Sequence, residues 1–101
     1  MKVYLDDERV TPEGWFRVYE PASCIGILET GMVTEISLDH DLGSDDLHGT
    51  GYDVILWIEE QVANNNFVPP RMVVHSSNSS ARIKMELGIK QIRKLYENSG
   101  G

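Results

Sequence analysis

Residues 33–53 constrain the fold more than any other part of the chain. An apolar strand around Ile36 breaks directly into an acidic run at residues 39–41. A glycine-rich acidic loop follows, and a helix is predicted to begin near Tyr52. Open sheets built from alternating strands and helices bind ligands beyond the carboxyl ends of their strands. The stretch therefore predicts a strand that delivers carboxylates to a ligand.

The rest of the chain repeats this alternation. Strands are predicted at residues 2–5, 16–19, 36–38 and 72–74, and helices from Pro21 to a cap at Gly31, over 51–66, and after a cap at Ser79 or Ser80. This order implies parallel pairing through right-handed crossovers. We expect one three-layer α/β domain over residues 1–97, with a parallel sheet in the order 2-1-3-4 and helices on both faces. Residues 98–101 are expected to form a disordered tail.

Composition and charge restrict the class of protein. The chain has 101 residues and a single cysteine, Cys24, so no intrachain disulfide can form. It begins with no signal peptide and has no apolar run near the roughly 20 residues of a membrane span, so we expect a soluble cytoplasmic protein. A net charge of −7 argues against binding to duplex DNA. The late cations are expected on a solvated helix face, with contact to RNA or another anion as the alternative: Arg82, Lys84, Lys90, Arg93 and Lys94.

The first predicted strand also ends in carboxylates, Asp6 and Asp7, and the expected strand order places them beside Asp39. Each pair of carboxylates about 4 Å apart repels by roughly 4 kcal/mol at an effective dielectric constant of about 20. Three such pairs approach the whole stability of a domain, about 5–15 kcal/mol. Because Mg²⁺ and Mn²⁺ prefer oxygen ligands, we predict one of these ions bound by all three residues. The alternative is three solvated carboxylates that never meet.

Polar residues also follow the fourth predicted strand, at residues 75–78. The hydroxyl, amide and backbone N–H groups of Ser76 and Asn78, placed before a helix, are suited to phosphate oxygens. Simple capping of the helix by serine or asparagine explains them equally well. His75 and His40 are candidates for a general acid or base, because histidine titrates near neutral pH.

Four motifs in chain order resemble the cyclic-phosphate-processing receiver domain family. They are LDDERVTP at residues 5–12, SLDHDLG at 37–43, the helix start at 51–57 and VVHSSN at 73–78. The resemblance covers about residues 1–96 and implies a receiver-like (flavodoxin-like) fold. In ordinary receivers, an acidic pair and an acceptor aspartate hold Mg²⁺, and the acceptor takes a phosphoryl group. By position these are Asp6, Asp7 and Asp39, with Ser76 contacting the phosphoryl oxygens.

The chain departs from signalling receivers at several positions. It has no evident fifth strand and no matching lysine, and it gains His40, Asp41, His75 and Asn78. The resemblance therefore implies a metal-dependent phosphoesterase that acts on a cyclic phosphate of an RNA end or of a nucleotide-derived small molecule. In that role Asp39 or a metal-bound water attacks phosphorus, and His75 or His40 moves the proton. Arg9 and Asn78 clamp the non-bridging oxygens.

Three other functions stay open on the sequence. A receiver-like phosphoacceptor or binding module would use Asp39 without hydrolysis. A haloacid-dehalogenase-like phosphatase would use Asp39 and Asp41, because LDHDLGS resembles the D-x-D signature of that family. A partner-binding module with a vestigial site would not need the acidic residues at all.

Overall fold

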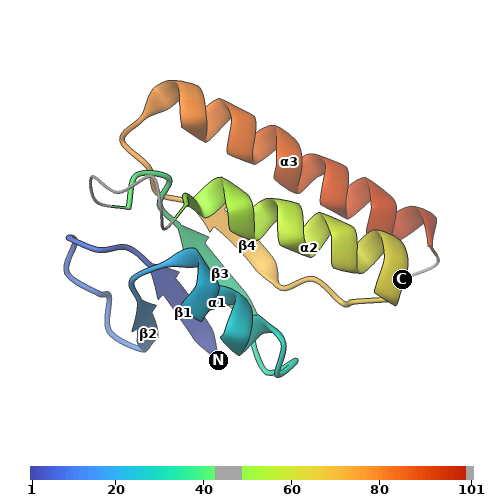
Figure 1. Ribbon diagram of the computed structural model, residues 1–101, viewed down its shortest axis with the longest axis horizontal. Helices are drawn as coiled ribbons and strands as arrows, with labels where there is room; N and C mark the ends of the chain where they lie inside the picture. Colours follow the sequence, from blue (N-terminus) through green and yellow to red (C-terminus); the bar gives the residue numbers. More distant parts are fainter. Residues whose placement is uncertain (43–48, 100–101) are drawn as a thin grey trace.

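The fold is built on a parallel sheet, shown in Figure 1 as a computed structural model whose residues 1–42 and 49–99 are described here. The elements are β1 (Lys2–Leu5), β2 (Trp15–Val18), α1 (Pro21–Leu28), β3 (Glu35–Leu38), α2 (Gly51–Asn65), β4 (Arg71–Val74) and α3 (Ser79–Asn98). All strand pairs are parallel, in the order β2-β1-β3-β4. This confirms the predicted strand order and the receiver-like α/β class. Within the described ranges, no fifth strand pairs with β4.

All three helices pack against one face of the sheet. Helix α2 contacts both α1 and α3, so the helices form a single row (Figure 1). One core joins the helices to the strand residues on that face, which are Val3, Leu5, Val18, Ile36, Leu38, Met72 and Val74. The prediction that helices cover both faces of the sheet is therefore wrong, and the described residues form two layers. The reason is local: residues 6–14, between β1 and β2, contain no crossover helix.

The ends of α1 and α2 follow from local sequence. Helix α1 begins at Pro21, as predicted, but its C-cap is Glu29. Gly31, the predicted cap, has a φ of 74° and lies in the tighter turn that follows. Helix α2 begins with a reciprocal capping box between Thr50 and Asp53, which satisfies backbone donors at the helix start.

Helix α3 differs from the prediction at both ends. Its N-cap is Asn78, whose Oδ1 accepts a hydrogen bond from the Ala81 N–H at 3.1 Å, and not Ser79 or Ser80. The helix extends to Asn98, so that residue belongs to α3 and not to the predicted tail. None of the helices in the described residues has both the length and the apolarity that a membrane span requires.

The start of α2 lies directly against the end of β3. The Gly51 N–H donates to the carbonyl oxygen of His40 at 3.4 Å. A methyl group on Gly51 would overlap the carbonyl oxygen of Asp39 and would stand 3.0 Å from Met85 Cε. Glycine at this position therefore lets helix and strand end approach closely, and the contact fixes the backbone that carries Asp39.

We predict that Gly51→Ala destabilises the fold by about 1–3 kcal/mol, the usual cost of overpacking. The added methyl meets backbone, which cannot turn away as a side chain can. Urea denaturation followed by circular dichroism measures the change. Gly26→Ala is the matched control, because Gly26 lies in α1 and a methyl group added there would meet no atom within 4 Å. That variant should be stabilised by about 0.5–1 kcal/mol, and equal effects at both positions would contradict the packing argument.

Candidate functional site

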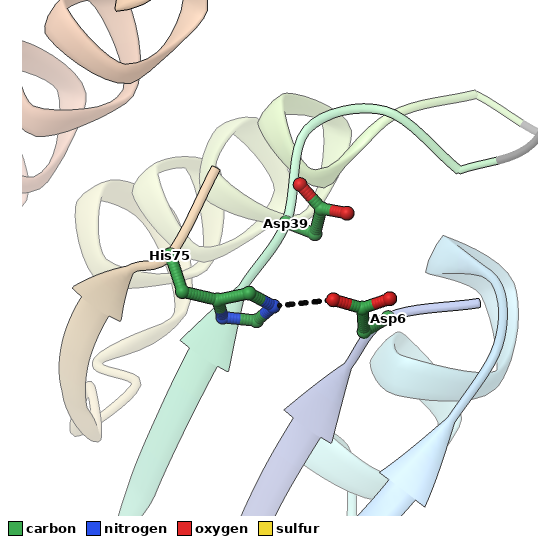
Figure 2. A group of neighbouring side chains, drawn as sticks. All are labelled: Asp6, Asp39 and His75. Carbon is green, nitrogen blue, oxygen red and sulfur yellow. Dashed lines mark hydrogen bonds and ion pairs between the residues drawn. The ribbon is translucent and has the colours of Figure 1, made fainter. Parts of the chain in front are cut away.

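The register of the sheet gathers three polar side chains at one edge. The last residues of β1, β3 and β4 stand opposite one another, and the residues that follow them are Asp6, Asp39 and His75. The backbone hydrogen bonding of the sheet continues through these residues. The Asp39 N–H donates to the carbonyl oxygen of Leu5, and the His75 N–H donates to the carbonyl oxygen of Leu38, each at 3.0 Å. Figure 2 shows the three side chains together, and ligand atoms from them lie within 4.8 Å of one another.

Asp6 is the most constrained member of this group. It is fully buried, and its Oδ1 accepts hydrogen bonds from the backbone N–H groups of Glu8 and Arg9 at 2.8 and 2.9 Å. Burial raises the pKa of Asp6, but the hydrogen bonds from Arg9 and Glu8 and the contact with His75 outweigh it. The pKa is therefore lowered from its ordinary value of 3.8, and Asp6 is ionised at neutral pH.

Asp39 has the opposite electrostatic environment. Only 9% of its surface is exposed. Burial, and then repulsion from the Asp6 carboxylate, raise the pKa of Asp39 above its ordinary value, although His75, Arg9 and a backbone hydrogen bond from His40 partly offset the rise. The folded protein thus disfavours the ionised form of Asp39. A bound cation would relieve this unfavourable interaction.

His75 is held between two polar partners and an aromatic ring. Its Nε2 lies 3.0 Å from Oδ2 of Asp6, and its Nδ1 lies 2.7 Å from the Ser37 hydroxyl. The Tyr4 ring stacks on the imidazole with centroids 4.3 Å apart. Burial lowers the pKa of His75 despite the opposing effect of Asp6, so the ring is neutral at pH 7. Because ionised Asp6 can only accept, Nε2 carries the hydrogen and Nδ1 accepts from Ser37.

Ser37 and Tyr4 are site residues that the sequence analysis missed. Both are buried, and they stand opposite each other in the register of β3 and β1. One signal was present in the sequence: Ser37 lies between the apolar residues Ile36 and Leu38 in a central strand. A buried hydroxyl needs a hydrogen-bond partner. The sequence does not say that the partner is a histidine from another strand.

Arg9 reaches the site from the loop after β1. Its guanidinium donates to the carbonyl oxygen of His75 and lies 3.9 Å from Oδ2 of Asp6. Its side chain is 42% exposed. Arg9 therefore braces the ends of β1 and β4 and still presents a cationic surface to solvent.

The other predicted site residues are placed differently. Asp7 is partly exposed and is not a member of the group of ligand atoms within 4.8 Å. His40 is paired through Nδ1 with the Asp41 carboxylate at 2.7 Å. Ser76 is buried, and its Oγ accepts from the Asn78 N–H at 3.1 Å, while Asn78 also caps α3. Three residues of the acidic loop lie outside the described ranges: Asp45, Asp46 and His48.

The donor set of this site fits a hard divalent cation. Two carboxylates from adjacent strand ends supply oxygen ligands, which Mg²⁺ and Mn²⁺ prefer. Asp6 accepts three hydrogen bonds, and an ionised carboxylate has about four acceptor positions, so one remains. His75 uses both ring nitrogens in hydrogen bonds and so holds Asp6 in place, as partners of metal ligands commonly do.

We predict that Asp39→Asn stabilises the metal-free protein at pH 7 by about 0.5–2 kcal/mol, the usual size for a stabilising substitution. The raised pKa of Asp39 means that its ionisation favours the unfolded chain. The gain should therefore be present above the folded pKa and should vanish below the ordinary value of 3.8. Urea denaturation in a chelating buffer measures it. Glu13→Gln, at an exposed loop position, removes the same charge and should change stability little; a destabilised Asp39→Asn would contradict the repulsion.

The comparison with known proteins agrees with this geometry. No curated protein and no solved structure gives a significant match to the chain. Residues 1–91 match the family described as the cyclic-phosphate processing receiver domain. The match includes all four strands and the three residues gathered at their ends. The chain therefore belongs to the cyclic-phosphate-processing receiver domain family.

Proposed function

We propose that the protein is a metal-dependent phosphoesterase that acts on a cyclic phosphate of an RNA end or of a nucleotide-derived small molecule. The observation that carries the proposal is the convergence of Asp6, Asp39 and His75 at adjacent strand ends. Membership in a family that processes cyclic phosphates supplies the class of substrate. The pKa of Asp6 is lowered and that of Asp39 is raised, which supports different roles for the two carboxylates.

Asp6 and Asp39 are the residues that would hold Mg²⁺ or Mn²⁺, with Asp7 as a further oxygen donor from the adjoining loop. When bound, such an ion supplies positive charge that polarises a phosphate ester and offsets the charge developed during attack at phosphorus. Asp39 suits this role because burial and Asp6 disfavour its charge without a cation. Asp6 suits it because three hydrogen bonds fix its orientation.

His75 is the better of the two proton-transfer candidates. It is neutral at pH 7, and its hydrogen is on Nε2 next to the carboxylates. Ser37 and Tyr4 fix the ring, which gives the proton a defined position. His40 is the alternative, but its Nδ1 is occupied by the hydrogen bond with the Asp41 carboxylate.

Phosphate oxygens have three available donors. The Arg9 guanidinium is partly exposed beside Asp6 and His75. The Oδ1 atom of Asn78 is used by the helix cap, which leaves its Nδ2 to donate. The hydroxyl oxygen of Ser76 accepts from the backbone, and its hydrogen is free to donate. These groups are suited to orienting a phosphate over Asp39.

A phosphoacceptor without hydrolysis is the second candidate. It is favoured by the position of Asp39 at the end of the central strand β3, where a carboxylate can receive a phosphoryl group. Incubation with a small phosphodonor would distinguish the two. A stable phosphoryl group on Asp39, without hydrolysis of any cyclic phosphate, would select the second.

The metal prediction is that Mn²⁺ or Mg²⁺ binds once per chain. Two carboxylates in a buried site should give heat on titration that Asp39→Asn abolishes. Isothermal calorimetry measures the binding, with Glu13→Gln as the charge-matched control. The absence of heat with either ion in the unsubstituted protein would remove the metal site.

The activity prediction is that Asp39→Asn lowers turnover of a cyclic phosphate by at least about a thousandfold, and that His75→Gln lowers it by about 10²–10⁴-fold. The panel comprises a 2′,3′-cyclic mononucleotide, an RNA ending in a 2′,3′-cyclic phosphate, and ADP-ribose cyclic phosphate, each with Mg²⁺ or Mn²⁺. Release of the phosphomonoester is followed by ³¹P NMR.

Glu13→Gln is again the control and should retain full activity, because Glu13 is exposed and lies outside the site. Full turnover by Asp39→Asn would refute the role given to that carboxylate. Failure of the unsubstituted protein on every member of the panel would argue for the phosphoacceptor instead.

A further inference from the structure

The β4 edge of the sheet borders a groove. Among the described residues, strand β4 pairs only with β3, and α3 lies beside it (Figure 1). The hollow between them has a volume of about 320 Å³. Its lining includes Met72 and Val74 from β4 and Arg82, Glu86, Lys90 and Arg93 from α3. A second hollow, of about 520 Å³, adjoins it along α3 and shares Lys90 and Arg93. Together they form the β4–α3 groove.

The charge of the β4–α3 groove is opposite to that of the chain. Its cations are Arg82, Lys90, Arg93 and Lys94, and its anions are Glu86 and Glu97. The local charge is thus +2, whereas the chain as a whole carries −7. Four of the nine lysines and arginines of the chain line this groove. This cluster of cations on an otherwise acidic protein is suited to binding a polyanion.

The groove leads to the candidate site. Val74 lines its floor, and the next residue is His75. Arg82 lies near the start of α3, where its N–H bonds to the carbonyl of Asn78. From Arg82 to Arg93 the helix rises about 16 Å, at 1.5 Å per residue. The cations therefore form a line that runs away from the site for the length of a short run of nucleotides.

We infer that the β4–α3 groove binds the single-stranded RNA that precedes a terminal cyclic phosphate. This inference rests on the proposed function and selects an RNA end over a small molecule as the substrate. The phosphodiesters upstream of the terminus lie against the cations of α3, and the exposed apolar side chains of the lining, Val73 and Leu87, contact bases. Because cations in such a groove contact the phosphates of the RNA backbone, this binding does not depend on the base sequence.

Addition of a peptide strand to β4 is the less favoured use of the same edge. The strand has four residues, follows Pro69 and Pro70, and begins with exposed Arg71. Short strands, prolines and edge cations are features that discourage strand addition. The cations of the groove, in contrast, lie on the helix, where they do not oppose a polyanion.

The test compares Lys90→Ala/Arg93→Ala with Lys2→Ala/Lys84→Ala. Both double variants remove two positive charges, but Lys2 lies over the Trp15 ring and Lys84 over the Tyr52 ring, away from the groove. Binding of a fluorescein-labelled RNA of about eight nucleotides with a 3′-phosphate is measured by anisotropy between about 50 and 200 mM salt. Values of kcat/KM are measured for the same RNA with a cyclic end and for a cyclic mononucleotide.

We expect the groove variant, Lys90→Ala/Arg93→Ala, to bind the RNA at least about tenfold more weakly. The slope of log K against log salt concentration should become shallower by about 1.4, because each of the two lost phosphate contacts contributes about 0.7. Its kcat/KM for the RNA should fall by the same factor, while that for the mononucleotide is unchanged. Equal losses in both double variants, or no preference of the unsubstituted protein for RNA, would overturn the inference. So would a change of oligomeric state in the groove variant without a loss of RNA binding.

If neither the RNA nor the mononucleotide is turned over, the proposed function fails, and the anisotropy measurement still tests RNA binding in the groove. If the mononucleotide is turned over but the RNA binds no better in the unsubstituted protein than in the groove variant, only the groove fails.

Discussion

The in-register pairing of β1, β3 and β4 is the constraint on which the rest of the structure depends. Because the three strands end at the same level, the next residue of each falls into one row. Asp6 and Asp39 are thereby forced together beside His75 in a nearly dry environment. A slip of one residue in any pair would turn its side chains to the other face of the sheet. On the helix side, Gly51 at the start of α2 packs closely against the Asp39 backbone.

The two carboxylates respond to their proximity in opposite ways. Asp6 is compensated by backbone N–H groups and by His75, and so keeps its charge. Asp39 has less compensation, and burial together with the Asp6 charge raises its pKa. Strain of this kind is commonly retained at functional sites, where a ligand offsets it. It gives a physical reason to expect a cation beside Asp39.

The placement of all three helices on one face shapes the remainder of the molecule. Over residues 1–42 and 49–99, the opposite face of the sheet presents residues such as Lys2 and Arg71, both exposed. In the same ranges, β4 pairs only with β3, and a hollow lies between β4 and α3. The space beside the site is thus open to a long substrate.

The sequence by itself determined the element types, the parallel strand order and the two acidic strand ends. Apolar runs, helix periodicity and alternation are local signals, and right-handed crossovers leave few ways to connect them. It also identified Asp39 and His75 as members of one edge. It did not determine the layer count, because local patterns do not say on which face of the sheet a helix such as α3, which follows the last strand, packs.

Only the tertiary structure decided which polar groups meet. Asp6 and Asp7 are neighbours in sequence, yet the structure places only Asp6 in the group with Asp39 and His75. The Ser37–His75 hydrogen bond joins residues 38 positions apart, so no local pattern could indicate it. Asn78 caps α3 because its backbone is still extended, with φ −81° and ψ 102°, whereas Ser79 and Ser80 are already part of the helix. Residue types set the chemistry that is available, and the register of the sheet selects the part of it that is used.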